Sequence, residues 1–375
     1  MSNHLLSLLL LGFIIFTSAC KHEALDPQIN SLEKAYGDIS EDVGNDIIVS
    51  DRSIFLLGST STTSGKRIYL IKTDIDGNQI WNRKLGFGST ASGNSMILEE
   101  NGNLTICGTS NNRLTVYHTS DDGQTIWQAT NDSINSQGAD ILTTADGYLA
   151  CGTLEDGDRD LIISKFNLTG GHQWTRSYGG SMNEGGSGIL PLLNGHYLAY
   201  GYTESFGAGN RDHWLLEINA DGDSINSLPI GGSDYEESQE IIATQDNGFL
   251  ICGHSASVEP NHSVHVIKVN QTLNIAWERH LGYPHSHEGG EGITIDELGN
   301  IYAIGRSSSN STNGEDVFLT KLSSEGTLIS DTLVGGLFAD RGNAIAVNAS
   351  HVFIIGSTNS IGAGDNDVYL VKMPR

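Results

Sequence analysis

The stretch Ala139–Trp174, ADILTTADGYLACGTLEDGDRDLIISKFNLTGGHQW, contains one complete copy of the unit that decides the fold. Two apolar segments flank the turn pair Asp146-Gly147, and the second of them ends at Gly152. A longer loop, 154–159, leads to a third apolar segment, and a further turn precedes a fourth, which carries Trp174. Asp-Gly pairs supply the positive φ angles of tight hairpins. The stretch therefore predicts four consecutive antiparallel strands.

This unit recurs along the chain, each time as an apolar run that ends in glycine and a small or polar residue. Successive repeat glycines stand 44 to 52 residues apart. The repeat glycines are Gly58, Gly108, Gly152, Gly201, Gly253, Gly305 and Gly356. A period near fifty residues, made of short segments without helical periodicity, is typical of a four-stranded propeller blade.

The two ends of the repeat region complement each other. The last unit stops at a third strand, 368–373, with no fourth strand after it. The first segment, Ser31–Gly37, aligns with Trp174–Gly179, which is a fourth strand. We therefore expect the N-terminal strand to complete the last blade and to hide two open sheet edges. The fold class predicted for residues 31–375 is all-β, a single seven-bladed β-propeller.

Several repeat segments resemble a known family. Gly231–Glu236, Asp246–Gly253 and Gly362–Lys372 are similar to the SBBP-type repeats of seven-bladed propellers, which are common in lipoproteins and secreted proteins of Bacteroidetes-like bacteria. The resemblance implies the propeller fold and an envelope location. It implies no single activity.

The N-terminus predicts export. Leu5–Phe16 is an apolar run without charge, shorter than the roughly 20 residues that span a bilayer. Ser18-Ala19-Cys20 follows it and resembles a lipobox, in which Cys20 receives the lipid. We expect a signal peptide over 1–19 and a lipidated tether over 20–30, the alternative being a secreted protein with a chance cysteine. Lys21 favours the outer membrane, on its periplasmic side or at the cell surface.

Composition excludes one class of partner. Lysine and arginine number 20 against 45 acidic residues, a formal net charge of -25. Such a chain repels polyanions at long range, so we expect no nucleic-acid binding. We expect a monomer.

Three cysteines share one repeat position, the residue before the repeat glycine. Cys107, Cys151 and Cys252 occupy it in the second, third and fifth units, and apolar residues occupy it elsewhere. Equivalent positions in different blades lie too far apart for a disulfide. We predict free core thiols.

Function is expected on one face of the propeller. We use the name long-loop face for the face that carries the fourth-to-first and second-to-third connections, and tight-turn face for the opposite one. Asp46, Asp140 and Glu240 share one repeat position on the innermost strands and would direct carboxylates toward the central channel. They could bind a cation or a polyhydroxylated ligand, or they could cap inner-strand amides or hold channel water.

A further candidate is the loop His285-Ser286-His287-Glu288. If it is extended, alternation directs both imidazoles to one side, and His287 and Glu288 are the candidate ligands. No cysteine or third histidine nearby completes a tetrahedral set, so the alternative is a glycine-rich loop without a binding role. The acidic segments 155–160 and 74–78 have the oxygen density that calcium prefers, but neither continues to a glutamate at loop position 12, so turn chemistry alone is the preferred explanation. No cofactor is evident from the motifs, and a divalent cation such as calcium is the candidate. Whether the five candidate ligands share one pocket is a question for the structure.

We therefore expect a membrane-anchored, extracytoplasmic, non-catalytic binding or scaffold module for an envelope protein or a glycan. The alternative is a propeller enzyme that acts on polysaccharide or depends on a quinone. It rests on Asn167–Trp174, which resembles the Thr-Gly-x-x-x-Trp signature of quinoprotein propellers.

Overall fold

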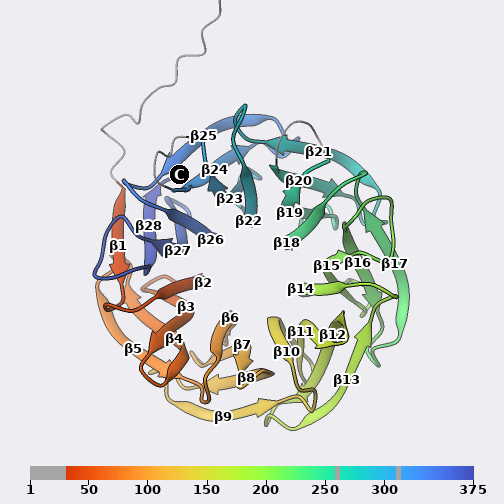
Figure 1. Ribbon diagram of the computed structural model, residues 1–375, viewed down its shortest axis with the longest axis horizontal. Coiled ribbons are helices and arrows are strands. Elements are labelled where there is room, and N and C mark those ends of the chain that lie inside the picture. Colours follow the sequence, from red (N-terminus) through yellow and green to blue (C-terminus); the bar gives the residue numbers. More distant parts are fainter. Residues whose placement is uncertain (1–30, 258–261, 310–313) are drawn as a thin grey trace, which may run out of the picture.

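The computed structural model describes residues 31–257, 262–309 and 314–375, and these form a closed ring of seven four-stranded antiparallel sheets (Figure 1). Every element in these ranges is a strand. No helix in them is long and apolar enough to cross a membrane. The predicted signal peptide, tether and Cys20 lie outside the described residues.

Blades 1 to 3 each consist of four consecutive strands, numbered from the channel outward. Blade 1 contains β2 (Asp42–Val49), β3 (Ser53–Thr62), β4 (Gly65–Asp74) and β5 (Gln79–Leu85). Blade 2 contains β6 (Ala91–Leu98), β7 (Leu104–Ser110), β8 (Arg113–Thr119) and β9 (Thr125–Thr130). Blade 3 contains β10 (Ser136–Thr144), β11 (Gly147–Asp156), β12 (Asp158–Asn167) and β13 (His172–Tyr178).

Blades 4 to 6 repeat this order. Blade 4 contains β14 (Glu184–Pro191), β15 (Tyr197–Thr203), β16 (Asp212–Ile218) and β17 (Ser224–Ile230). Blade 5 contains β18 (Glu236–Ala243), β19 (Phe249–Ser255), β20 (Ser263–Val269) and β21 (Ile275–Leu281). Blade 6 contains β22 (Glu288–Ile295), β23 (Ile301–Ser307), β24 (Asp316–Leu322) and β25 (Leu328–Val334).

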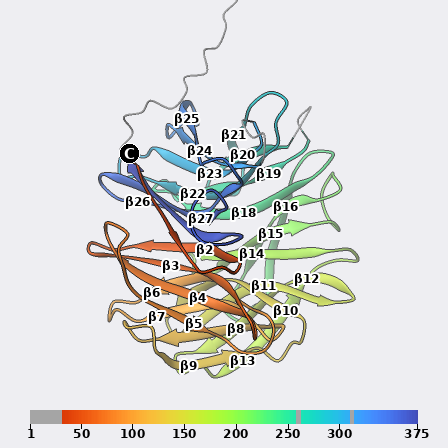
Figure 2. The same ribbon diagram turned by 60° about the vertical axis from the view of Figure 1, so that its left-hand side comes forward.

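Blade 7 confirms the predicted closure. It contains β26 (Asp340–Val347), β27 (His351–Thr358), β28 (Asp367–Pro374) and, as its outer strand, β1 (Leu32–Tyr36) from the N-terminal end. Strand β1 pairs antiparallel with β28, with Leu32 opposite Lys372 and Tyr36 opposite Val368, so that the start of β1 lies beside the C-terminal end of the chain (Figure 2). The Tyr36 hydroxyl also donates to the carbonyl of Gly77 in blade 1 at 2.6 Å, so β1 joins both blades.

The core is divided among the blade interfaces. Seven clusters of buried apolar side chains each combine residues of two neighbouring blades, one cluster for each of the seven interfaces. Trp81, Trp127, Trp174 and Trp277 each pack against one of these clusters. The four indoles therefore pack between neighbouring blades.

Each inner strand carries a bulge at the same repeat position, for example between Gly138 and Asp140. The repeat glycine of the next strand lies beside this bulge. A Cβ at Gly152 would stand 1.8 Å from the carbonyl oxygen of Gln137. A Cβ at any of the other six repeat glycines would stand 1.7 to 2.0 Å from the carbonyl oxygen of an inner-strand residue. Only glycine fits this approach, and that explains why it marks every repeat.

The distribution of long loops differs from the prediction in blades 1 to 3. The connection predicted as a longer loop over 154–159 is a tight hairpin in which β11 and β12 are separated by Gly157 alone. The second-to-third connections of blades 1 and 2 are also tight turns, of two residues each, at 63–64 and 111–112. Backbone pairing continues to the ends of these strands, and acidic side chains at 155–158 are accommodated on an exposed hairpin.

Candidate functional site

The channel carboxylates lie at one level of the ring. Asp46, Asp140 and Glu240 each follow the bulged residue of an inner strand in blades 1, 3 and 5. All three line a cavity of about 220 Å³ in the channel, together with Glu291 and Tyr200. The prediction that these acids point toward the channel is therefore confirmed in position.

Each of these carboxylates also caps the next blade. Asp46 Oδ2 accepts from the backbone N–H of Met96 at 2.7 Å. Asp140 Oδ2 accepts from the N–H of Ile189 at 2.9 Å, and Glu240 Oε2 accepts from that of Ile293 at 2.6 Å. The three acids therefore tie blades 1 to 2, 3 to 4 and 5 to 6, which is the capping role considered from the sequence.

Burial controls the protonation of this group. Desolvation raises the pKa of Asp46 to about 7 and that of Glu240 to about 8, and it raises the pKa of Asp140 as well. Glu291, at the bulge of blade 6, has its pKa raised to about 7 for the same reason. At neutral pH the channel thus holds carboxyl groups that can donate as well as accept hydrogen bonds.

His287 and Glu288 are separate from the channel. Glu288 is buried at the start of β22, where its Oε1 accepts from the hydroxyls of Ser286 and Ser307. His287 is exposed, and its ring lies 5.6 Å from that of His262. His285 has a φ of +67°, so the segment is not extended as assumed. The five candidate residues do not share one pocket.

Glu288 belongs to a set of buried acids that the sequence analysis did not identify. Acids at the start of the inner strands accept hydrogen bonds from the loop before them. Glu184, for example, accepts from the N–H of Gly180 at 2.7 Å and the hydroxyl of Thr203 at 2.9 Å. The corresponding residues are Asp42, Glu184, Glu236, Glu288 and Asp340. Their common position before the bulge was the available signal, and their role is to order the long-loop face.

The two calcium-like segments form turns. Asp74 Oδ1 accepts from the N–H groups of Asp76 and Asn78 at 3.0 and 2.8 Å. In the hairpin of blade 3, Glu155 pairs with Arg159 at 2.9 Å. These contacts are the turn chemistry that was the alternative to calcium binding.

The quinoprotein-like segment also has structural contacts. The N–H and hydroxyl of Thr169 both donate to Asn167 Oδ1, at 3.0 and 2.9 Å, within the turn before β13. The indole of Trp174 lies under the glycine turn of the next blade, where a Cβ on Gly222 would approach it to 2.9 Å. Thr169 thus stabilises the turn, and Trp174 packs between two blades.

The cysteines are free and buried, as predicted. Cys107, Cys151 and Cys252 form no disulfide, and burial raises the pKa of each thiol above its usual range. Each Sγ lies against an inner-strand glycine of the next blade. They pack as small apolar residues.

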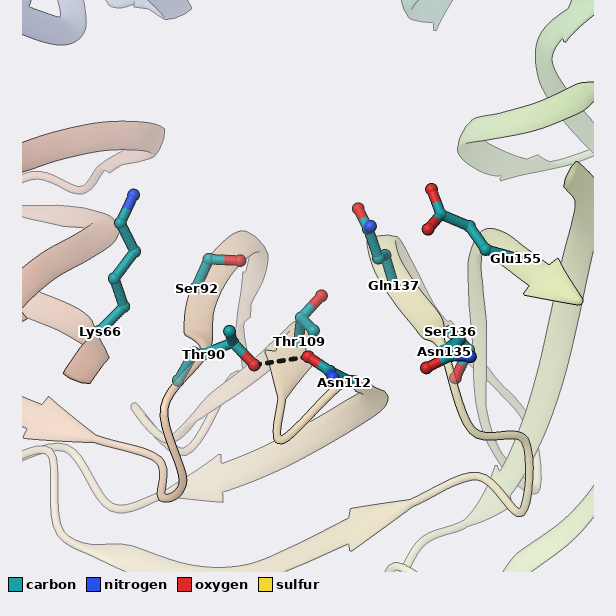
Figure 3. A pocket seen from close by; sticks show the side chains of 10 residues that line it. Lys66, Thr90, Ser92, Thr109, Asn112, Asn135, Ser136, Gln137 and Glu155 are labelled. Carbon is teal, nitrogen blue, oxygen red and sulfur yellow. Dashed lines mark hydrogen bonds between the residues drawn. The ribbon is translucent and has the colours of Figure 1, made fainter.

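The long-loop face is hollowed above blade 2 (Figure 3). Strands β7 and β8 of blade 2 have seven residues each, whereas the corresponding strands of blades 1 and 3 have ten, and this difference leaves a notch of about 520 Å³ above blade 2. Lys66 and Glu155 stand on opposite sides of it, and hydroxyl and amide groups lie between them. Within the notch, Thr90 donates to Asn112 Oδ1 at 2.8 Å.

The same face carries exposed apolar side chains above blades 7 and 1. We use the name apolar patch for Ile39, Leu337, Phe338 and Ile361. Ile39 is 85% exposed and Leu337 is 80% exposed. Their loops are in contact: the N–H of Phe338 donates to Ser360 Oγ at 3.0 Å, and a Cβ on Gly364 would lie 2.9 Å from the Ile39 backbone. Loops joined in this way hold the patch in place.

A histidine cluster between blades 4 and 5 was not identified from the sequence. Within the described residues, His265, Glu278 and His280 are the one set of three possible metal ligands whose donor atoms all lie within 4.8 Å of one another. They come from strands β20 and β21. Twelve residues separate His265 from Glu278, so only the strand register brings the three together.

The comparisons with known proteins agree with this architecture. A family model described as the SBBP beta-propeller repeat matches residues 279–311, which confirms the predicted repeat resemblance in that segment. No curated protein matches the chain in sequence.

Among solved structures, the chain is similar to the WD40 beta propeller domain of Doa1 at a TM-score of 0.55 and 11% identity, covering 91% of this chain and 94% of that one. It is similar to the Pseudomonas aeruginosa periplasmic gluconolactonase PpgL at a TM-score of 0.57 and 12% identity, covering 88% and 99%. It is also similar to Drosophila Plexin A, in complex with Semaphorin 1b, at a TM-score of 0.53 and 9% identity, covering 91% of this chain and 88% of that one. These likenesses define the class of protein, a seven-bladed β-propeller, and concern the fold alone.

Proposed function

We propose that the protein is a membrane-anchored extracytoplasmic binding module that holds an envelope protein through its long-loop face. The apolar patch carries this proposal. Large apolar side chains that are exposed together, on loops fixed to one another, are characteristic of protein interaction sites. A binding role suits loops that are held by a rigid scaffold.

The direction of β1 supports the use of this face. Strand β28 starts after a loop of the long-loop face, so its last residues lie toward the tight-turn face, as does Leu32 of β1, which is paired with Lys372. A lipid on Cys20 would therefore attach the propeller by its tight-turn side. The long-loop face would then point away from the membrane and be accessible to a partner.

Photo-crosslinking tests the proposal. A photoreactive amino acid replaces Leu337 in the apolar patch, and a matched variant carries it at Leu193, which is 85% exposed on the tight-turn face. We expect one discrete crosslinked envelope protein from position 337, absent from position 193 and lost when Phe338→Asp is added. Equal crosslinking at both positions, or none at 337, would contradict the proposal.

A glycan is the second candidate ligand, favoured by the notch above blade 2. Its hydroxyl, amide and charged groups match the hydrogen-bonding surface of a sugar. A glycan array decides between the two ligands, since binding that is abolished by Gln137→Ala and unaffected by Phe338→Asp would favour the glycan. Turnover of a polysaccharide or a quinone dye by the purified protein would instead support the enzyme alternative.

A further inference from the structure

The cluster between blades 4 and 5 is formed by cross-strand pairing. His265 on β20 lies directly opposite His280 on β21, and Glu278 stands two residues before His280 on the same side of the sheet. The two imidazole rings stack with centroids 4.2 Å apart and planes 16° apart. His265 Nε2 lies 3.4 Å from Glu278 Oε2.

Histidines at these positions are peculiar to blade 5. The residue opposite the repeat glycine is Tyr, Thr, Ile, Trp, Phe or Tyr in the other six blades, and the positions of His280 and Glu278 carry no histidine there either. Blade 7 has a simpler version, in which the Tyr369 hydroxyl donates to Glu33 Oε2 at 2.6 Å. In blade 5 the acid is Glu278, and the imidazoles of His265 and His280 lie beside it in place of a tyrosine hydroxyl.

A second layer of groups orients His265. Its Nδ1 lies 3.1 Å from Nε2 of His213 in blade 4, and His213 Nδ1 lies 2.9 Å from Ser238 Oγ. If His265 donates to His213, and His213 to Ser238, the Nε2 lone pair of His265 is free for a metal ion. Hydrogen bonds of this kind to the remote ring nitrogen are typical of metal-binding histidines.

The three side chains of the cluster border an open cleft. His265, Glu278 and His280 line a cleft of about 870 Å³ between β17 and β21, on the outer side of the ring. Its other walls include the apolar residues Leu228 and Ile275 and the glycines of the loop at 231–232. The side chain of Glu278 is about half exposed there. Glu278 and His280 are thus accessible to a ligand, whereas His265 is only 4% exposed beside the His280 ring.

We propose that His265, Glu278 and His280 form a binding site for one divalent metal ion of the zinc class, with its remaining coordination positions open to the cleft. Two imidazole nitrogens and one carboxylate suit zinc and similar transition ions, whereas calcium requires six or more oxygen ligands. Because parallel stacked rings cannot both direct a lone pair to one ion, His280 turns out of the stack when the metal binds. Its Nδ1 lies 3.1 Å from Ser263 Oγ, so its Nε2 is the ligand atom.

Zinc titration tests the site. Purified protein without a histidine tag is stripped with a chelator and titrated with Zn²⁺ by calorimetry, and with Co²⁺ by visible absorption. We expect a site of one ion per chain that His280→Ala and Glu278→Gln each weaken by at least about tenfold. The matched control Glu33→Gln, at the equivalent position of blade 7, should leave the affinity unchanged, and Ca²⁺ should not compete.

Thermal unfolding by circular dichroism verifies that the variants are folded, which is expected because both changed side chains are partly exposed. The proposal is overturned if about 0.1 mM Zn²⁺ fails to bind stoichiometrically, or if His280→Ala binds zinc as tightly as the unchanged protein. Neither result depends on the apolar patch, so the site can be tested independently of the proposed partner.

Discussion

At the scale of the residue, the repeat glycine is the clearest constraint. Gly152→Ala would place a Cβ 1.8 Å from the Gln137 carbonyl oxygen, and a backbone atom cannot move away without breaking the bulge. We expect a loss of about 3 kcal/mol or more in the free energy of unfolding, measured by chemical denaturation. In Gly195→Ala the new Cβ meets no atom within 4 Å and only the φ of +81° is strained, so the cost should be about 1 kcal/mol. Equal losses would refute the steric explanation.

The channel acid Glu240 makes stability depend on pH. Its pKa of about 8 in the folded protein lies above its ordinary value of 4.5, so between these values the folded state binds more protons than the unfolded state. Stability should therefore fall as pH rises through this window. Glu240→Gln mimics the protonated form and should flatten the curve, with a gain on the order of 1–3 kcal/mol at pH 8. Melting curves from pH 5 to 8 provide the measurement, and parallel curves for the two proteins would contradict the assignment.

The location of residues that share a repeat position could be predicted from the sequence. Contacts that depend on the register between two strands could not. Asp46, Asp140 and Glu240 share one repeat position, so their convergence on the channel followed from the period. The contact of His265 with Glu278 and His280 depends on which residues of β20 and β21 lie opposite each other. A shift of one residue would have sent the side chains to opposite sides of the sheet.

At the scale of the element, the outer-strand tryptophans stabilise the blade interfaces. The indole of Trp174 packs on the core between blades 3 and 4, and Arg176 lies 5.8 Å above it. Trp174→Ala should cost about 2–3 kcal/mol, less than a fully buried tryptophan because one side is exposed. Asn226 holds the same repeat position in blade 4, and Asn226→Ala should change stability by less than about 0.5 kcal/mol. Urea unfolding of both variants measures the difference, and similar losses would exclude the packing role.

Strands were more predictable than the loops between them. Asp-Gly and Asn-Gly pairs mark the tight turns, and alternation marks the strands, so the four-stranded blade and β1 were expected. The hairpin at Gly157 was not, because acidic and glycine residues suit an exposed strand end as well as a loop. The notch above blade 2 depends on the difference in strand length between the β7–β8 hairpin and the longer β3–β4 and β11–β12 hairpins.

At the scale of the whole molecule, ring closure determines where the proposed tether would leave the propeller. Residues 21–31 span at most about 40 Å when extended, and a seven-residue strand spans about 23 Å. The proposed tether would join the tight-turn end of β1, so the shortest path from a lipid on Cys20 would bring that face to the membrane.

Quenching by spin-labelled lipids can measure this orientation in vesicles that carry the lipidated protein. A fluorophore on Asp122→Cys, in a turn of the tight-turn face, should be quenched more strongly than one on Ala208→Cys, in the loop between β15 and β16. Cys107, Cys151 and Cys252 are buried and should not react with the label. A stronger effect at 208 would place the apolar patch against the membrane. Its occupant would then be lipid, and the proposal of an envelope protein partner would fail.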